Sequence, residues 1–172
     1  LMAVKHPEKV NAIVLIDSVC FDSWPIPEFA PLLKPGVEEK TTSDELVNIL
    51  KDFLPKGVFD QSVMTEDLVR LYVGPWSSDQ GKAAMFRNLR RLNKEYTQAI
   101  AGELKHLPHE TLILWGDHDN FQKPEYAPQL EQAIPNASLV WLVNAGHWSI
   151  DEQPEKVTKL IGDFLQKNGN HQ

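Results

Sequence analysis

Two residues of this sequence have the type and the spacing to perform proton-transfer chemistry. His147 follows the apolar stretch 139–143 and a turn that ends at Gly146, and Asp119 follows the apolar stretch 111–115. A histidine on a loop after a core strand is held firmly at its base and is open at its tip, as proton transfer requires. An acid and a histidine placed in this way are two of the three parts of a nucleophile–His–acid apparatus.

Asp119 is the favoured acid, because it can accept a hydrogen bond from His147 and hold the ring in one tautomer. Asp17 is a rival acid, since it also ends an apolar run, although a structural role in its turn is favoured. His118 is predicted to be an exposed turn residue. Residues 117–119 are consecutive on a tight turn and cannot easily face one ion, so no metal site is predicted there.

The elements that must position these residues alternate between strands and helices. Residues 10–16 are nearly continuously apolar, which is typical of a parallel strand that is buried on both faces. The five apolar residues 139–143 predict a buried strand, and residues 111–115 predict another strand. Helical spacing follows at 124–134 and again at 157–165. This order predicts an α/β open sheet, in which the ligand site lies at the carboxyl ends of the strands.

Residues 21–109 predict helices and no strand. Thr42 with Glu45 and Ser77 with Gln80 fit capping boxes, and Thr65 fits an N-cap. The segment has the length and position of a helical lid inserted between two strands. We therefore expect three parts: residues 1–20 as a core helix end and strand, 21–109 as the lid, and 110–172 as the core that carries the acid and the histidine.

The bulk properties exclude several classes of function. The net charge of −7 argues against nucleic acid or an anionic membrane as partner. No apolar run approaches the ~20 residues of a membrane span. Cys20 is the only cysteine, and no signal peptide opens the sequence, so a cytoplasmic location is expected.

Several motifs together resemble the C-terminal half of an α/β-hydrolase-fold protein. They are Leu-Trp-Gly-Asp-His-Asp at 114–119, Ala-Gly-His-Trp at 145–148 and Glu-Gln-Pro-Glu-Lys-Val at 152–157. His-Pro-Glu-Lys-Val at 6–10 and Ile-Val-Leu-Ile-Asp-Ser at 13–18 resemble the helix end and strand that follow the nucleophile elbow of that superfamily. The resemblance covers essentially the whole chain, with residues 21–109 as the variable lid.

The resemblance implies a hydrolase in which Asp119 is the acid and His147 the general base. It implies a small, largely apolar, ester-like substrate and no cofactor. An epoxide hydrolase or haloalkane dehalogenase with an Asp nucleophile is the alternative within the superfamily. Phe21, Trp24 and Trp148 are candidates for lining the substrate pocket, although packing roles are equally compatible with their positions.

The sequence lacks the Gly-x-Ser-x-Gly elbow that would carry a serine nucleophile, and residues 1–5 resemble the end of a helix. We therefore expect a chain that lacks the N-terminal half of the fold, together with the nucleophile and the oxyanion hole. Such a chain is expected to be inactive and poorly soluble alone. A non-catalytic binding protein of the same fold and an inactive truncated product stay open as alternatives.

Overall fold

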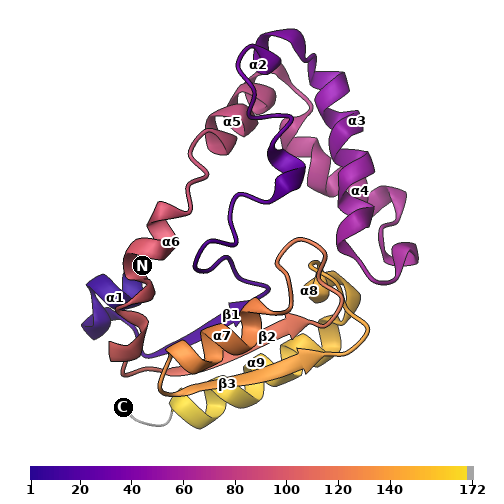
Figure 1. The fold of residues 1–172 in the computed structure, drawn as a ribbon. Coiled ribbons are helices and arrows are strands. Elements are labelled where there is room, and N and C mark those ends of the chain that lie inside the picture. Colours follow the sequence, from indigo (N-terminus) through magenta and orange to yellow (C-terminus); the bar gives the residue numbers. More distant parts are fainter. Residues whose placement is uncertain (170–172) are drawn as a thin grey trace.

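The computed structural model describes residues 1–169, and a three-stranded parallel sheet forms its base (Figure 1). The strands are β1 (Ala12–Ile16), β2 (Glu110–Gly116) and β3 (Ala137–Leu142), and they lie in the order β1-β2-β3. The register pairs Ile16 with Leu114 and Gly116 with Leu142. The carboxyl ends of all three strands therefore meet at one edge of the sheet.

The three strands differ in burial. Residues 111–116 of β2 are all buried, whereas every residue of β1 is only half-buried. In β3, Trp141 is 37% exposed while Leu142 is fully buried. The predictions that residues 10–16 are buried on both faces and that residues 139–143 form a buried strand are thus wrong. Within residues 1–169, β1 and β3 each pair with β2 alone, and apolar composition does not reveal such an edge position.

Helices cover both faces of the sheet. Helix α7 (Tyr126–Ala133) packs on the face that carries Ile113, and α9 (Pro154–Gly169) packs on the face that carries Leu114. Neighbouring residues of β2 serve opposite faces because side chains alternate along a strand. This arrangement agrees with the predicted α/β open sheet.

Residues 21–109, all of which the structure describes, contain helices and turns but no strand, as the sequence predicts. Figure 1 shows this helical segment leaving the sheet after β1, arching above it and returning through α6 to β2. It has its own apolar cluster, in which Leu46 and Phe86 are almost completely buried. Its helices are α2 (Val37–Lys40), α3 (Ser43–Phe53), α4 (Glu66–Val73), α5 (Asp79–Leu89) and α6 (Glu95–Ala101).

Two of the three N-caps predicted for this segment are observed in the structure. Thr42 and Glu45 form the predicted capping box at the start of α3, and Thr65 caps α4. Helix α5 is capped by Ser78, whose Oγ accepts from the amide of Gly81 at 3.1 Å, and not by Ser77. The Ser77 hydroxyl instead donates to the carbonyl oxygen of Gly74 at 2.8 Å, because a 3₁₀ turn ends there.

Two short helices complete the described core. Helix α1 (Met2–Lys5) precedes β1, and α8 (Ser149–Glu152) follows the turn after β3. Short 3₁₀ helices lie at Pro7–Lys9, Pro27–Phe29, Leu54–Gly57, Gln61–Val63, Gly74–Trp76 and Leu104–His106. None of the helices within residues 1–169 is both long and apolar enough to cross a membrane.

Candidate active site

The turn after β2 holds the carboxylate of Asp119 through bonds to neighbouring residues. The amide of Asp119 donates to the carbonyl oxygen of Gly116 at 3.2 Å and closes the turn. Its Oδ1 accepts from the amides of Phe121 and Gln122 at 2.7 and 2.8 Å. Asp119 is only 3% exposed, so its carboxylate is fixed and largely shielded from water. These two bonds leave Oδ2 to face the next turn.

The turn after β3 brings His147 to that oxygen. Asn144 takes the left-handed conformation with φ at 57°, which turns the chain back over the strand ends. Nδ1 of His147 then lies 2.9 Å from Oδ2 of Asp119. An ionised carboxylate accepts from a protonated Nδ1, and in that tautomer a neutral histidine ring has a lone pair on Nε2. Within residues 1–169 no hydrogen bond engages Nε2, so the arrangement suits a general base.

Two glycines permit the close approach of the turns. A Cβ at Gly116 would lie 2.3 Å from the carbonyl oxygen of Gly146, and a Cβ at Gly146 would lie 2.3 Å from that of Gly57. Both distances are shorter than any ordinary contact and both involve backbone atoms. A side chain at Gly116 would therefore push the His147 turn away from the Asp119 turn, and a side chain at Gly146 would push it away from Gly57 in the helical segment.

Asp17 lies beside the pair but does not bond to His147. Its Oδ1 accepts from the amide of Gly116 at 2.7 Å, and its other oxygen accepts from the hydroxyl of Ser149. Burial raises the pKa of Asp17 to about 7, against the lowering effect of these hydrogen bonds. The structure thus places Asp17 as a bridge between the two turns, which matches the structural role favoured from sequence.

The other polar residues of the turn after β2, Asp117 and His118, do not bond to the side chains of Asp119 and His147. His118 is exposed, and its Nδ1 lies 2.7 Å from Oδ1 of Asp117. Burial acts to raise the pKa of Asp117, but hydrogen bonds with His118 and the amide of Ala145 outweigh it and lower that pKa overall. The described residues contain no group of three or more His, Cys, Asp or Glu side chains that could hold a metal ion.

The helical segment touches the His147 turn directly. The carbonyl oxygen of Gly57 accepts from the amides of His147 and Trp148 at 2.6 and 3.3 Å. The indole Nε1 of Trp148 donates to the carbonyl oxygen of Leu54 at 3.0 Å, and its ring packs against the apolar cluster of the helical segment. Trp148, predicted as a pocket candidate, thus joins the core to the helical segment.

A row of aromatic rings extends from His147 into the helical segment. Phe121 lies edge-on to His147 at 5.5 Å and stacks on Phe53 at 4.4 Å between ring centroids. Phe53 in turn contacts Phe29, whose ring lies 5.7 Å from that of Trp24 in a T-shaped arrangement. Trp24, the second pocket candidate, is thus connected to His147 through three phenylalanine rings.

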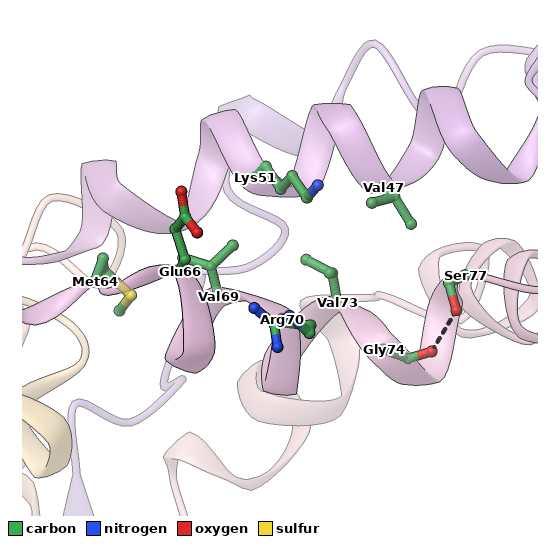
Figure 2. Close-up of a pocket in the computed structure, with 9 residues that line it drawn as sticks. All are labelled: Val47, Lys51, Met64, Glu66, Val69, Arg70, Val73, Gly74 and Ser77. Atoms are coloured by element: carbon green, nitrogen blue, oxygen red, sulfur yellow. Dashed lines mark hydrogen bonds between the residues drawn. The ribbon is translucent and has the colours of Figure 1, made fainter.

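Phe21, the third pocket candidate, lies elsewhere. Its ring stacks on Tyr126 at 6.5 Å, and it lines an apolar pocket of about 320 Å³ beside β1. Neither His147 nor Asp119 lines that pocket. A second pocket, of about 570 Å³, lies in the helical segment between α3 and α4 (Figure 2), and neither His147 nor Asp119 lines it.

Sequence reasoning missed the residues that join the two regions. No role is predicted for Glu152 from sequence beyond its place in the motif at 152–157, yet its carboxylate bonds to both the His147 turn and the helical segment. Gly57 and Phe121 also contact the His147 turn. The position of Glu152 inside the motif at 152–157 was a signal that could have directed attention to it.

Comparison with known proteins gives the family. The sequence profile described as "Alpha/beta hydrolase family" matches residues 1–160. A 2-hydroxy-6-oxononadienedioate/2-hydroxy-6-oxononatrienedioate hydrolase of Pseudomonas putida is 28% identical over 166 residues, covering 95% of this chain and 57% of the relative. A 2-hydroxymuconate semialdehyde hydrolase of the same species is 27% identical over 168 residues, with the same two coverages.

Solved structures agree on the fold. An alpha/beta hydrolase fold protein from Burkholderia ambifaria superposes with a TM-score of 0.78 at 17% identity, covering 94% of this chain and 60% of that protein. The chain thus spans less than two thirds of the length of these relatives, so it corresponds to part of their fold. It includes the sheet edge where Asp119 and His147 meet, and the profile match extends across both residues. The chain belongs to the alpha/beta hydrolase family.

Proposed function

We propose that His147 and Asp119 are the general base and the acid of a hydrolase that acts through a nucleophile–His–acid triad. The observation that carries this proposal is the 2.9 Å hydrogen bond from Nδ1 of His147 to Oδ2 of Asp119. It leaves Nε2 unprotonated in the neutral ring, able to take a proton from a nucleophile or from water. Asp119 would then stabilise the imidazolium that forms.

The nucleophile of this triad is proposed to lie outside the 172 residues. Within residues 1–169 no serine, threonine or cysteine bonds to Nε2 of His147, and Ser149 is already bonded to Asp17. A Ser nucleophile would form an acyl-enzyme, whereas an Asp nucleophile would form the alkyl-enzyme of an epoxide hydrolase or a dehalogenase. A segment that carries the nucleophile and the oxyanion hole is the partner that this chain requires.

The substrate is proposed to be small and largely apolar, with an ester-like group. Phe121 and Trp148 both pack edge-on against His147, so the surroundings of the base are aromatic. Helices 21–109 would act as the lid, because Leu54 and Gly57 hydrogen-bond to the residues around His147. Enclosing the base in this way would exclude water from the reacting atoms.

A second candidate substrate class comes from the relatives. Several of them are hydrolases of 2-hydroxymuconate semialdehyde or of 2-hydroxy-6-oxononadienedioate. We therefore include carbon–carbon bond hydrolysis of such compounds beside ester hydrolysis. A non-catalytic binding protein is disfavoured, because binding alone does not require an acid hydrogen-bonded to a histidine at the strand ends.

The test is to express the complete reading frame that contains this chain and to assay it beside the 172-residue chain alone. Nitrophenyl esters and 2-hydroxymuconate semialdehyde are the two substrates. The complete frame should turn over one of them, and the chain alone should show no turnover above background. His147→Gln should lower kcat by at least ~10³-fold, in the upper range for loss of a general base.

His118→Gln is the matched control, because His118 occupies the neighbouring turn but bonds to Asp117. It should leave kcat within about 2-fold, because the side chain of His118 bonds to Asp117 and not to His147 or Asp119. Turnover by the 172-residue chain alone, or normal turnover by the His147→Gln enzyme, would show that the proposed function is wrong.

A further inference from the structure

The carboxylate of Glu152, at the end of α8, joins two segments that are far apart in the sequence. Its Oε2 accepts from the amide of Gly146 at 2.6 Å. Its Oε1 accepts from the amides of Phe59 and Asp60 at 2.7 and 3.0 Å. One side chain therefore satisfies three backbone donors, one in the His147 turn and two in the helical segment.

The loop held by Glu152 supports the backbone of His147. This loop, Gly57–Asp60, begins at the residue whose carbonyl oxygen accepts from the amides of His147 and Trp148. The contact is tight, since a Cβ at Gly146 would lie 2.9 Å from Cα of Val58. A shift of the Gly57–Asp60 loop would therefore move the His147 backbone and lengthen the bond to Asp119.

The partners of Glu152 are backbone amides and not cationic side chains. Among residues 1–169, none of the ion pairs includes it. An ionised carboxylate forms stronger hydrogen bonds with amides than a neutral acceptor does, and it uses both oxygens here. The nearby Asp151 serves a different contact, because it accepts from the hydroxyl of Tyr72 at 2.6 Å.

We propose that Glu152 is a positioning residue that couples the helical segment to the general base. It fixes the Gly57–Asp60 loop against Gly146 and thereby keeps Nδ1 of His147 directed at Asp119. The proposal rests on the proposed function of His147 and deepens it. The base is correctly oriented only while the helical segment is docked on the His147 turn.

The test compares Glu152→Ala and Glu152→Gln with the wild type, each in the complete reading frame that contains this chain. Glu155→Gln is the control, because Glu155 is exposed in the first turn of α9, three residues away. Hydrogen exchange is read at Phe59, Asp60 and Gly146. The ¹⁵N shifts of the His147 ring report whether Nδ1 or Nε2 carries the proton.

In Glu152→Ala, exchange at these three amides should accelerate by at least ~10-fold, while the amides of β2 and α9 keep their wild-type rates. The His147 ring should change from the Nδ1–H tautomer to a mixture. Glu152→Gln retains one acceptor oxygen, so it should show a smaller change of the same kind. Glu155→Gln should match the wild type in both measurements.

The proposal is overturned if both Glu152 variants keep the wild-type tautomer and exchange rates. It is also overturned if exchange accelerates equally in β2 and α9, since Glu152 would then serve only global stability. A wild-type ring that lacks the Nδ1–H tautomer would instead contradict the proposed function of His147. The two failures are therefore distinguishable.

Discussion

The turns that carry Asp119 and His147 meet at one sheet edge, but they are held in different ways. The carboxylate of Asp119 accepts from amides only two and three residues ahead, and its turn closes on Gly116. The backbone of His147 bonds to Gly57, which lies far away in the helical segment. The hydrogen bonds from backbone amides to the Asp119 carboxylate are thus local, whereas the backbone of His147 depends on a long-range bond.

This difference predicts that the two turns respond differently to substitutions elsewhere in the chain. Changes in the helical segment should loosen the His147 turn more than the Asp119 turn, which contacts that segment through the side chains of Asn120 and Phe121. Substitutions at the carboxyl ends of the strands should affect both turns. Local opening of one region without the other is common in proteins, and it is visible in hydrogen exchange.

The largest effect is expected from Leu46→Ala, which removes a fully buried side chain from the core of the helical segment. The loss should lower the free energy of unfolding of that segment by about 2–5 kcal/mol, because a cavity remains. Exchange at His147 and Trp148 should accelerate more than exchange at Phe121, whose amide bonds locally to Asp119. Ile49→Ala, at a position 41% exposed on the same helix, should cost far less.

Asp17→Asn tests the bridge between the two turns. The folded-state pKa of Asp17 is raised from 3.8 to about 7, so the folded chain binds more protons than the unfolded chain within that range. The free energy of unfolding should therefore fall as the pH rises from about 4 to about 7.

Because asparagine has no such charge, Asp17→Asn should gain stability relative to the wild type over this range, by at most about 4 kcal/mol. Denaturant titrations at pH 4.5 and pH 8 measure the difference. Asp52→Asn, at an exposed position of α3, is the control and should show no comparable change. If the free energy of unfolding depends on pH equally in Asp17→Asn and the wild type, the raised pKa of Asp17 in the folded chain is contradicted.

Gly146→Ala should disrupt the contact between the His147 turn and the Gly57–Asp60 loop directly. The added Cβ would meet the carbonyl oxygen of Gly57 at 2.3 Å, so the loop and the turn must separate. Overpacking of this kind costs about 1–3 kcal/mol. Gly102→Ala is the control, because a Cβ there meets nothing within 4 Å. Thermal melts and the ¹⁵N shifts of the His147 ring should change only in Gly146→Ala.

The smallest effect is expected from Thr42→Ala, which removes the capping box of α3. Loss of an N-cap costs about 1 kcal/mol. Exchange at His147 should accelerate slightly and exchange at Phe121 should accelerate less. A response of the same size at both amides would show that the two turns are not held separately.

The parts of the fold that depend on local signals could be predicted from sequence. The strand ends at Asp17, Asp119 and His147 follow from apolar runs that stop at turn residues, and the capping box at Thr42 follows from a spacing of three. The prediction of an α/β-hydrolase fold is confirmed by the family match and by the structural similarity. The roles of Asp119 and His147 stay predictions.

The parts that depend on long-range contacts could not be predicted. The exposure of Trp141 is set by which strands lie beside β3, and the sequence of β3 does not contain that information. The bonds of Glu152 to Phe59 and Asp60 join residues more than 90 positions apart. Ser78 caps α5 in place of the predicted Ser77 because Ser77 is the C-cap of a 3₁₀ helix that was not predicted from sequence.

Hydrogen exchange of the wild-type chain at increasing denaturant tests most directly whether the acid and the base are held separately. The amides of Phe121 and Gln122, which donate to Asp119, should exchange with the opening free energy of β2. The amide of His147, which donates to Gly57, should exchange with the lower opening free energy of the helical segment. A single opening free energy for all three amides would contradict this account.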